Sequence, residues 1–158
     1  MLVVKCNEAQ VVPLLLVKSE RARRLHAFGV SIVAIALLGI AFFLTPSTEG
    51  IGTHRQLGLP TCGWILIADL PCPTCGMTTA WSHTVRGELP SAFMAQPLGM
   101  LLAIVAFLVA IGGLITTITG YSFKALLYMY SPSTIFIFVG ALVLVSWSFK
   151  IFLHRGVL

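Results

Sequence analysis

Charged side chains are scarce in this chain of 158 residues. Ten Lys and Arg and five Asp and Glu make up 9% of it, whereas hydrophobic residues make up 58%. Soluble domains carry about 25% charged residues, so this composition excludes an ordinary soluble fold. The long apolar stretches instead predict an integral membrane protein with a lipid bilayer around it, built as a single membrane domain over residues 1–158.

The sequence also lacks the motifs of common enzymes and pumps. No Ser–His–acid arrangement, Gly-rich phosphate loop or pair of carboxylates can be assembled from it. The apolar stretches contain no pair of opposite charges that would mark an ion path. Basic residues do not alternate with aromatic residues on one face, so the net charge of +5 does not indicate nucleic-acid binding. The sequence therefore favours a protein that is not an enzyme, without deciding the question.

Three apolar stretches are long enough to cross a bilayer, which takes about 20 helical residues. We expect an all-α, polytopic membrane protein with short interfacial helices in the loop between its first two spans. The expected segments are an N-terminal tail at 1–25, spans at 26–45, 97–118 and 133–153, and a cysteine-containing loop at 46–96. A cleaved signal peptide is the alternative for the first span, but its apolar core exceeds the usual length of about 7–15 residues.

Lys and Arg near the span ends predict the orientation, because they accumulate on the cytoplasmic side. With the N-terminus in the cytoplasm, six of them lie on that side and four on the other. We therefore expect a multi-pass protein of the bacterial cytoplasmic (inner) membrane, with a cytoplasmic N-terminus and the loop at 46–96 on the non-cytoplasmic side.

Two features inside the spans bear on packing. Gly112 and Gly113 in the second span indicate either a close helix contact or a flexible point. Lys150, near the end of the third span, is expected to extend its side chain outward to the membrane surface.

The loop contains three of the four cysteines. Cys72 and Cys75 belong to the sequence Cys-Pro-Thr-Cys-Gly, and Cys62 lies ten residues before Cys72. Two thiolates on such a turn can bind one metal ion or join as a disulfide, and the glycine permits the positive φ that the turn needs. Zinc knuckles of this kind usually occur in pairs that supply four sulfur ligands. The sequence therefore predicts a candidate zinc site that is short of one ligand.

The fourth ligand would have to come from His54, His83 or Asp69. We assign His83 to the candidate metal site with the three cysteines, against the alternative that it is an interfacial histidine facing water. Asp69 stands in an apolar stretch, where a helix cap or a loop hydrogen bond is the simpler role because an unpaired buried carboxylate is costly.

Redox chemistry is the alternative to metal binding. Thiols on an oxidising face of a membrane tend to pair. Cys72 and Cys75 would then act as a dithiol in a membrane-bound thiol–disulfide oxidoreductase, although the βαβ pattern of thioredoxin is absent. We favour a cluster of Cys62, Cys72 and Cys75 that staples the loop or binds a metal ion, with association with a membrane protein or a second copy as its purpose.

We interpret the residues that follow the cysteine knuckle at 72–76 as structural. We expect a short helix over 77–86, with Thr78 near its start and Gly87 just past its end. Arg86 and Glu88 are expected to face water or each other.

Around the cysteines the sequence resembles DUF2752, a family of small bacterial membrane proteins of unknown function. The matching positions are Cys62, Cys72, Pro73, Cys75, Gly76, Thr78, Gly87 and Pro97, within about residues 57–102. Thr79 stands where the family pattern has an arginine, and Gln96 replaces its asparagine. The resemblance implies a bacterial membrane protein and supplies no mechanism. If the arginine of the family pattern binds an anionic ligand, that ligand is not expected here.

Overall fold

The computed structural model describes residues 8–120 and 132–156, with side chains at 20–120 and 133–156. Every secondary-structure element in these ranges is a helix, which confirms the all-α prediction. The elements are α1 (Glu8–Phe43), the 3₁₀ helix η1 (Thr53–Leu57), α2 (Gly63–Ala68), α3 (Met77–Val85), α4 (Leu89–Ala95), α5 (Pro97–Thr119) and α7 (Pro132–His154).

Three of these helices are long and apolar enough to cross a membrane, as expected. They are Glu20–Phe43, Pro97–Thr119 and Ser133–His154, with mean hydropathies of 2.3, 2.8 and 2.2. Only 17%, 17% and 11% of these spans is buried inside the molecule. Their apolar side chains therefore point outward, as they do where lipid is the surrounding solvent.

The first helix begins much earlier than the sequence indicated. The segment at 1–25 was expected to be a tail, but α1 is helical from Glu8 onward. Residues 14–24 are mostly Leu, Lys, Glu, Ala and Arg, which are strong helix formers, and extending an existing helix costs little. At about 1.5 Å per residue, the 36 residues of α1 span roughly 54 Å, which exceeds the roughly 30 Å apolar core of a bilayer.

Small residues bring α1 and α5 together. A Cβ on Gly113 would collide with Ser31 Oγ and lie 3.0 Å from the carbonyl oxygen of Ala27, whereas one on Gly112 would meet nothing within 4 Å. Ala34 and Ala110 are buried in the same pair of helices. Gly113 therefore marks a close helix contact, which is how small residues serve in membranes.

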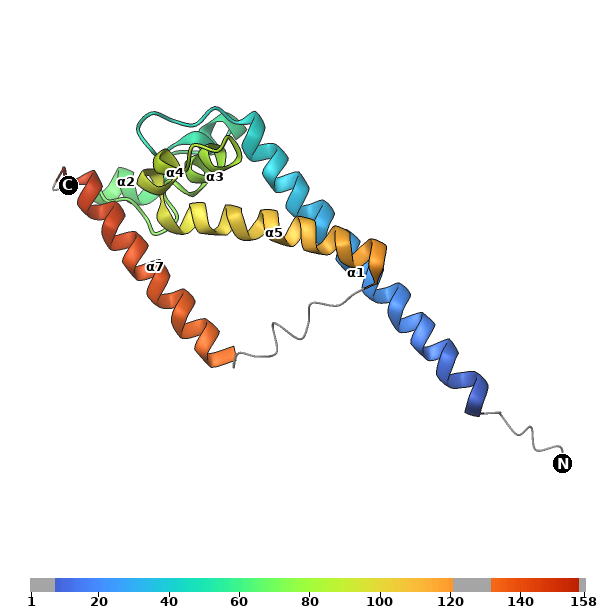
Figure 1. Ribbon diagram of the computed structural model, residues 1–158. Helices are drawn as coiled ribbons and strands as arrows, with labels where there is room; N and C mark the ends of the chain where they lie inside the picture. The colour runs from blue at the N-terminus through green and yellow to red at the C-terminus, as the bar shows by residue number, and fades with distance from the viewer. Residues whose placement is uncertain (1–7, 121–131, 157–158) are drawn as a thin grey trace.

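The short helices lie together at one end of the structure, where each of the three long helices begins or ends (Figure 1). These ends are the C-terminus of α1, the N-terminus of α5 and the C-terminus of α7. Pro97 is the first residue of α5 and Gly87 follows α3 with a φ of 80°, both as expected. Thr78 was expected near the helix start as a cap, but it lies inside α3, and Gly76 takes the N-cap position.

Arg86 binds the C-terminal end of α1 and does not meet Glu88. Its guanidinium donates hydrogen bonds to the carbonyl oxygens of Phe42 at 2.6 Å and Leu44 at 2.8 Å. The last carbonyls of a helix have no partner in the helix and attract cations, so Arg86 attaches the loop to α1.

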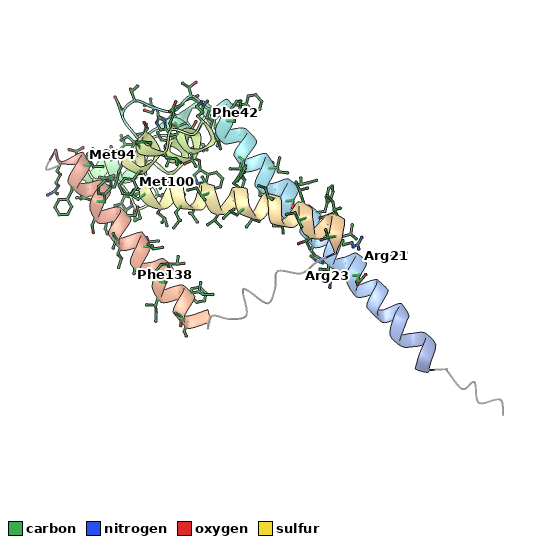
Figure 2. All side chains as sticks on the ribbon, in the orientation of Figure 1. Arg21, Arg23, Phe42, Met94, Met100 and Phe138 are labelled. Atoms are coloured by element: carbon green, nitrogen blue, oxygen red, sulfur yellow. The ribbon has the colours of Figure 1, made fainter. Side chains whose placement is uncertain are left out.

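The arginines at the start of the first span lie away from the short helices. Figure 2 labels Arg21 and Arg23 where α1 passes the C-terminal end of α5. Arg23 donates a hydrogen bond of 2.6 Å to the carbonyl oxygen of Gly120, which ends α5. This separation of the arginines from the cysteines agrees with the expected orientation, which stays a prediction.

Candidate metal centre

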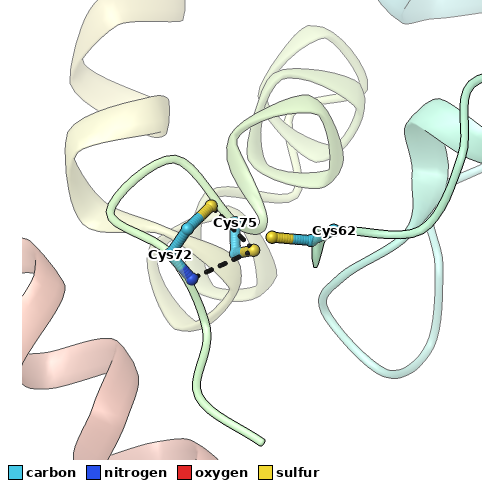
Figure 3. Close-up of side chains that lie close together, drawn as sticks. All are labelled: Cys62, Cys72 and Cys75. Atoms are coloured by element: carbon cyan, nitrogen blue, oxygen red, sulfur yellow. Dashed lines mark hydrogen bonds between the residues drawn. The ribbon is translucent and has the colours of Figure 1, made fainter. Parts of the chain in front are cut away.

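The three loop cysteines converge. Cys62 immediately precedes α2, while Cys72 and Cys75 lie in the turn before α3. Their sulfur atoms all lie within 4.8 Å of one another, and Figure 3 shows the sulfurs of Cys62 and Cys75 facing each other with Cys72 beside Cys75. The spacing in the sequence predicted this cluster.

Backbone hydrogen bonds shape the knuckle around Cys75. The amide of Cys75 donates to the carbonyl oxygen of Cys72 at 3.0 Å, and the amide of Cys72 donates to Cys75 Sγ at 3.3 Å. Gly76 has a φ of 89°, and a Cβ there would lie 2.6 Å from Ala95 O and 2.7 Å from Gly50 O. Only glycine suits this position, because both the conformation and the space exclude a side chain.

Side chains from α7 and from the start of α5 hold the knuckle in place. Trp147 Nε1 donates to the carbonyl oxygen of Pro71 at 2.9 Å, and Gln96 Nε2 donates to that of Pro73 at 2.9 Å. Gln96 is fully buried. The sequence singled out Gln96 only as a departure from the family pattern and gave no sign of either bond.

Lys150 does not extend to the membrane surface as expected. Its side chain is buried, and Nζ donates to the carbonyl oxygens of Gly50 at 3.1 Å and Ala95 at 2.8 Å. These oxygens flank Gly76, so the lysine lies beside the knuckle. It is the one charged residue between positions 133 and 153, which was the signal that could have identified it.

The thiols differ in acidity. Burial opposes ionisation of Cys62, but hydrogen bonding from Cys75, the Trp64 and Ile65 amides and Cys72 together lowers its pKa to about 7. Burial, together with the neighbouring sulfurs of Cys72 and Cys62, raises the pKa of Cys75 to about 12. Close thiols lose their protons in sequence because each charge opposes the next. Near neutral pH the cluster therefore places a thiolate at Cys62 and keeps the proton on Cys75.

None of the expected fourth ligands joins the sulfurs. Within the residues that the structure describes, the group of potential metal ligands consists of the three cysteines alone. The Nδ1 atom of His83 is 2.6 Å from a carboxylate oxygen of Glu88, so His83 is hydrogen-bonded to Glu88 elsewhere in the loop. Asp69 ends α2 and pairs with His154 at 3.5 Å, while His54 contacts the carbonyl oxygen of Pro60 at 3.1 Å.

A cavity of about 740 Å³ adjoins the cluster. All three cysteines line it, together with apolar residues of α1 such as Leu37 and Ile40 and with His54. A metal ion held by the three sulfurs would have room beside it for water or another small ligand, as zinc sites with three protein ligands do.

The comparisons with known proteins agree with the resemblance. Residues 60–110 match the sequence profile of the family described as "Protein of unknown function (DUF2752)". The matched range includes the three cysteines and helices α2 to α4, but not Trp147 or Lys150 of α7. No curated protein and no solved structure matches the chain. The description of the family names no activity.

Proposed function

We propose that Cys62, Cys72 and Cys75 bind one divalent metal ion as thiolates, with Zn²⁺ as the expected ion. The observation that carries this proposal is the approach of three sulfurs to within 4.8 Å. Around a tetrahedral zinc ion, with Zn–S bonds of about 2.3 Å, sulfur atoms lie roughly 3.8 Å apart. Small side-chain shifts therefore suffice to create the site, and thiolates favour zinc over the harder cations Mg²⁺ and Ca²⁺.

The bound metal fixes the loop between the first two spans. The part of this loop around α2 has little core of its own, since no residue of α2 is buried. Metal bonds from Cys62 to the knuckle join the start of α2 to the start of α3. Structural zinc contributes folding free energy directly, so the loop gains order where side-chain packing is sparse.

An ordered loop offers an apolar surface to a partner. Trp64, Leu66 and Ile67 of α2 are 52%, 72% and 90% exposed. Exposed apolar clusters mark contacts with proteins or membranes. We assign this face to a membrane protein or a second copy of the chain, on the non-cytoplasmic side of the bacterial inner membrane.

Metal analysis of the detergent-purified protein tests the proposal. We expect one equivalent of zinc per chain in the unaltered protein and its loss in a Cys72→Ser variant. Cys6→Ser is the matched control, because Cys6 takes no part in the proposed site and lies outside the described residues. A metal-free unaltered protein, or a Cys72→Ser variant that retains its zinc, would contradict the proposal.

Thiol–disulfide exchange is the second candidate, favoured by one contact. The sulfurs of Cys72 and Cys75 lie 3.0 Å apart. As a thiolate, one of them would attack a disulfide of a substrate protein and release one substrate thiolate. The other cysteine, as a thiolate, would then attack the cysteine sulfur of the mixed disulfide and release the second substrate thiolate. Cys72 and Cys75 would be left as a disulfide, with the substrate reduced to a dithiol. A metal-free protein that reduces a model disulfide, and loses this activity in Cys75→Ser, would favour this function.

A further inference from the structure

Lys150 carries a buried charge without an ion-pair partner among the described residues. Its side chain is 6% exposed, and its hydrogen bonds go to two backbone carbonyls. The carboxylates of Glu20, Glu88 and Asp69 contact other residues, namely Arg23, His83 and His154. A buried ammonium group is costly unless a negative charge compensates it, so Lys150 calls for an anion.

Two nearby groups could compensate the charge, and neither does so fully. Ala95 ends α4, where the helix dipole contributes at most about half a negative charge, and α4 has only seven residues. Glu49 lines the same cavity as Lys150, but its side chain is exposed and no ion pair joins the two.

The cysteine cluster also lies near the ammonium group. Nζ is 3.2 Å from the position that a Cβ on Gly76 would occupy, and Gly76 directly follows Cys75. Three thiolates around a divalent ion have a net charge of −1, which equals the charge of Lys150 in magnitude and is opposite in sign.

We infer that Lys150 is the counter-cation of the metal–thiolate centre. This inference rests on the proposed metal binding and names the residue that balances its charge. Lys150 is not a ligand, because its ammonium nitrogen has no lone pair while charged. Its role is to stabilise three thiolates packed within 4.8 Å, whose mutual repulsion would otherwise weaken the metal site. It also couples α7 to the site, so that metal binding fastens the third span to the loop.

Zinc affinity tests the inference in the full-length protein, measured by competition with a chromophoric chelator in detergent. Lys150→Met keeps the length of the side chain and removes the charge, and Lys150→Arg keeps the charge. We expect Lys150→Met to weaken zinc binding at least about tenfold, equivalent to about 1.4 kcal/mol. Lys150→Arg should recover most of this loss. Glu49→Gln is the control and should bind zinc as the unaltered protein does. If Lys150→Met does not fold, Lys150→Gln provides a neutral donor in its place.

Three results would overturn the inference, and they separate it from the proposed function. Equal zinc affinity in Lys150→Met and the unaltered protein would refute the counter-cation while leaving the metal site intact. A Lys150→Arg variant as weak as Lys150→Met would assign the residue a purely steric role. An unaltered protein that binds no zinc would refute both proposals.

Discussion

At the scale of the residue, the chemistry of the cluster depends on which thiols already carry a charge. The pKa of Cys62 is lowered to about 7 and that of Cys75 is raised to about 12. The spacing of the cysteines predicted that they would meet. It did not predict this difference in pKa, which arises from the burial of Cys75 and from the hydrogen bonds that Cys62 makes with Cys75 and with the amides at the start of α2. Nor did it exclude His83, whose pairing with Glu88 depends on the turn between them.

The zinc affinity should rise with pH, because zinc must displace the thiol protons. Above pH 7 Cys62 is already a thiolate, whereas Cys75 keeps its proton until far higher pH. Below pH 7 Cys62 is protonated as well, so one more proton must leave on binding. As the pH decreases, the logarithm of the zinc affinity should fall both above and below pH 7. We expect the slope below pH 7 to be steeper than the slope above it by about one unit per pH unit. Chelator competition from pH 6 to pH 8 measures this slope, and a flat profile would count against thiolate ligation.

Gly76→Ala should destabilise the loop and weaken metal binding. The substitution combines a positive φ, a strain of about 1–3 kcal/mol, with clashes against Ala95 O and Gly50 O. Gly58→Ala is the matched control, because Gly58 has a φ of 77° but open space around it. Thermal unfolding in detergent should show a larger loss for Gly76→Ala. Equal losses would mean that the close contacts at Gly76 contribute nothing.

At the scale of the element, the sequence predicted where the spans lie but not the side-chain contacts that join the helices to one another. Apolar length and Pro97 defined α5 closely, since lipid and proline each impose a boundary. The start of α1 was missed because the helix continues beyond the apolar stretch through residues that favour helix without being apolar. The contacts of Arg86 and Trp147 could not be read from the sequence, because they link residues 44 and 76 positions apart.

Arg86→Met should loosen α3 from the end of α1. The substitution removes charge-assisted hydrogen bonds to the carbonyls of Phe42 and Leu44, and we expect a loss of about 1.5 kcal/mol in the free energy of unfolding because the guanidinium is partly exposed. Arg55→Met serves as the control, since Arg55 is an exposed arginine of the same loop. A thermal unfolding midpoint that falls no further in Arg86→Met than in Arg55→Met would show that this attachment is unimportant.

At the scale of the whole molecule, one end of the helix assembly holds the cysteine cluster. The short helices and the three cysteines lie at one end, and Arg21 and Arg23 lie away from them (Figures 1 and 2). Composition predicted a membrane protein with such a loop, because nothing else accommodates so much apolar surface. It could not predict that the third span would contribute Lys150 to the cysteine end.

The loop should face the outside of the cytoplasmic membrane. Ile67 is 90% exposed on α2, so an Ile67→Cys variant offers an accessible thiol in a Cys6→Ser background. We expect a membrane-impermeant maleimide to label this variant in cells whose outer barrier is opened but whose inner membrane is intact. Labelling that requires disruption of the inner membrane would reverse the orientation.

The most direct measurement of the central claim is X-ray absorption at the zinc edge of the metal-loaded, detergent-purified protein. Convergence of Cys62, Cys72 and Cys75 predicts three sulfur ligands at about 2.3 Å and one lighter ligand such as water. A Cys62→Ser variant should show only two sulfurs. A zinc ion surrounded by nitrogen and oxygen alone, or a sulfur count unchanged by the loss of Cys62, would contradict the account.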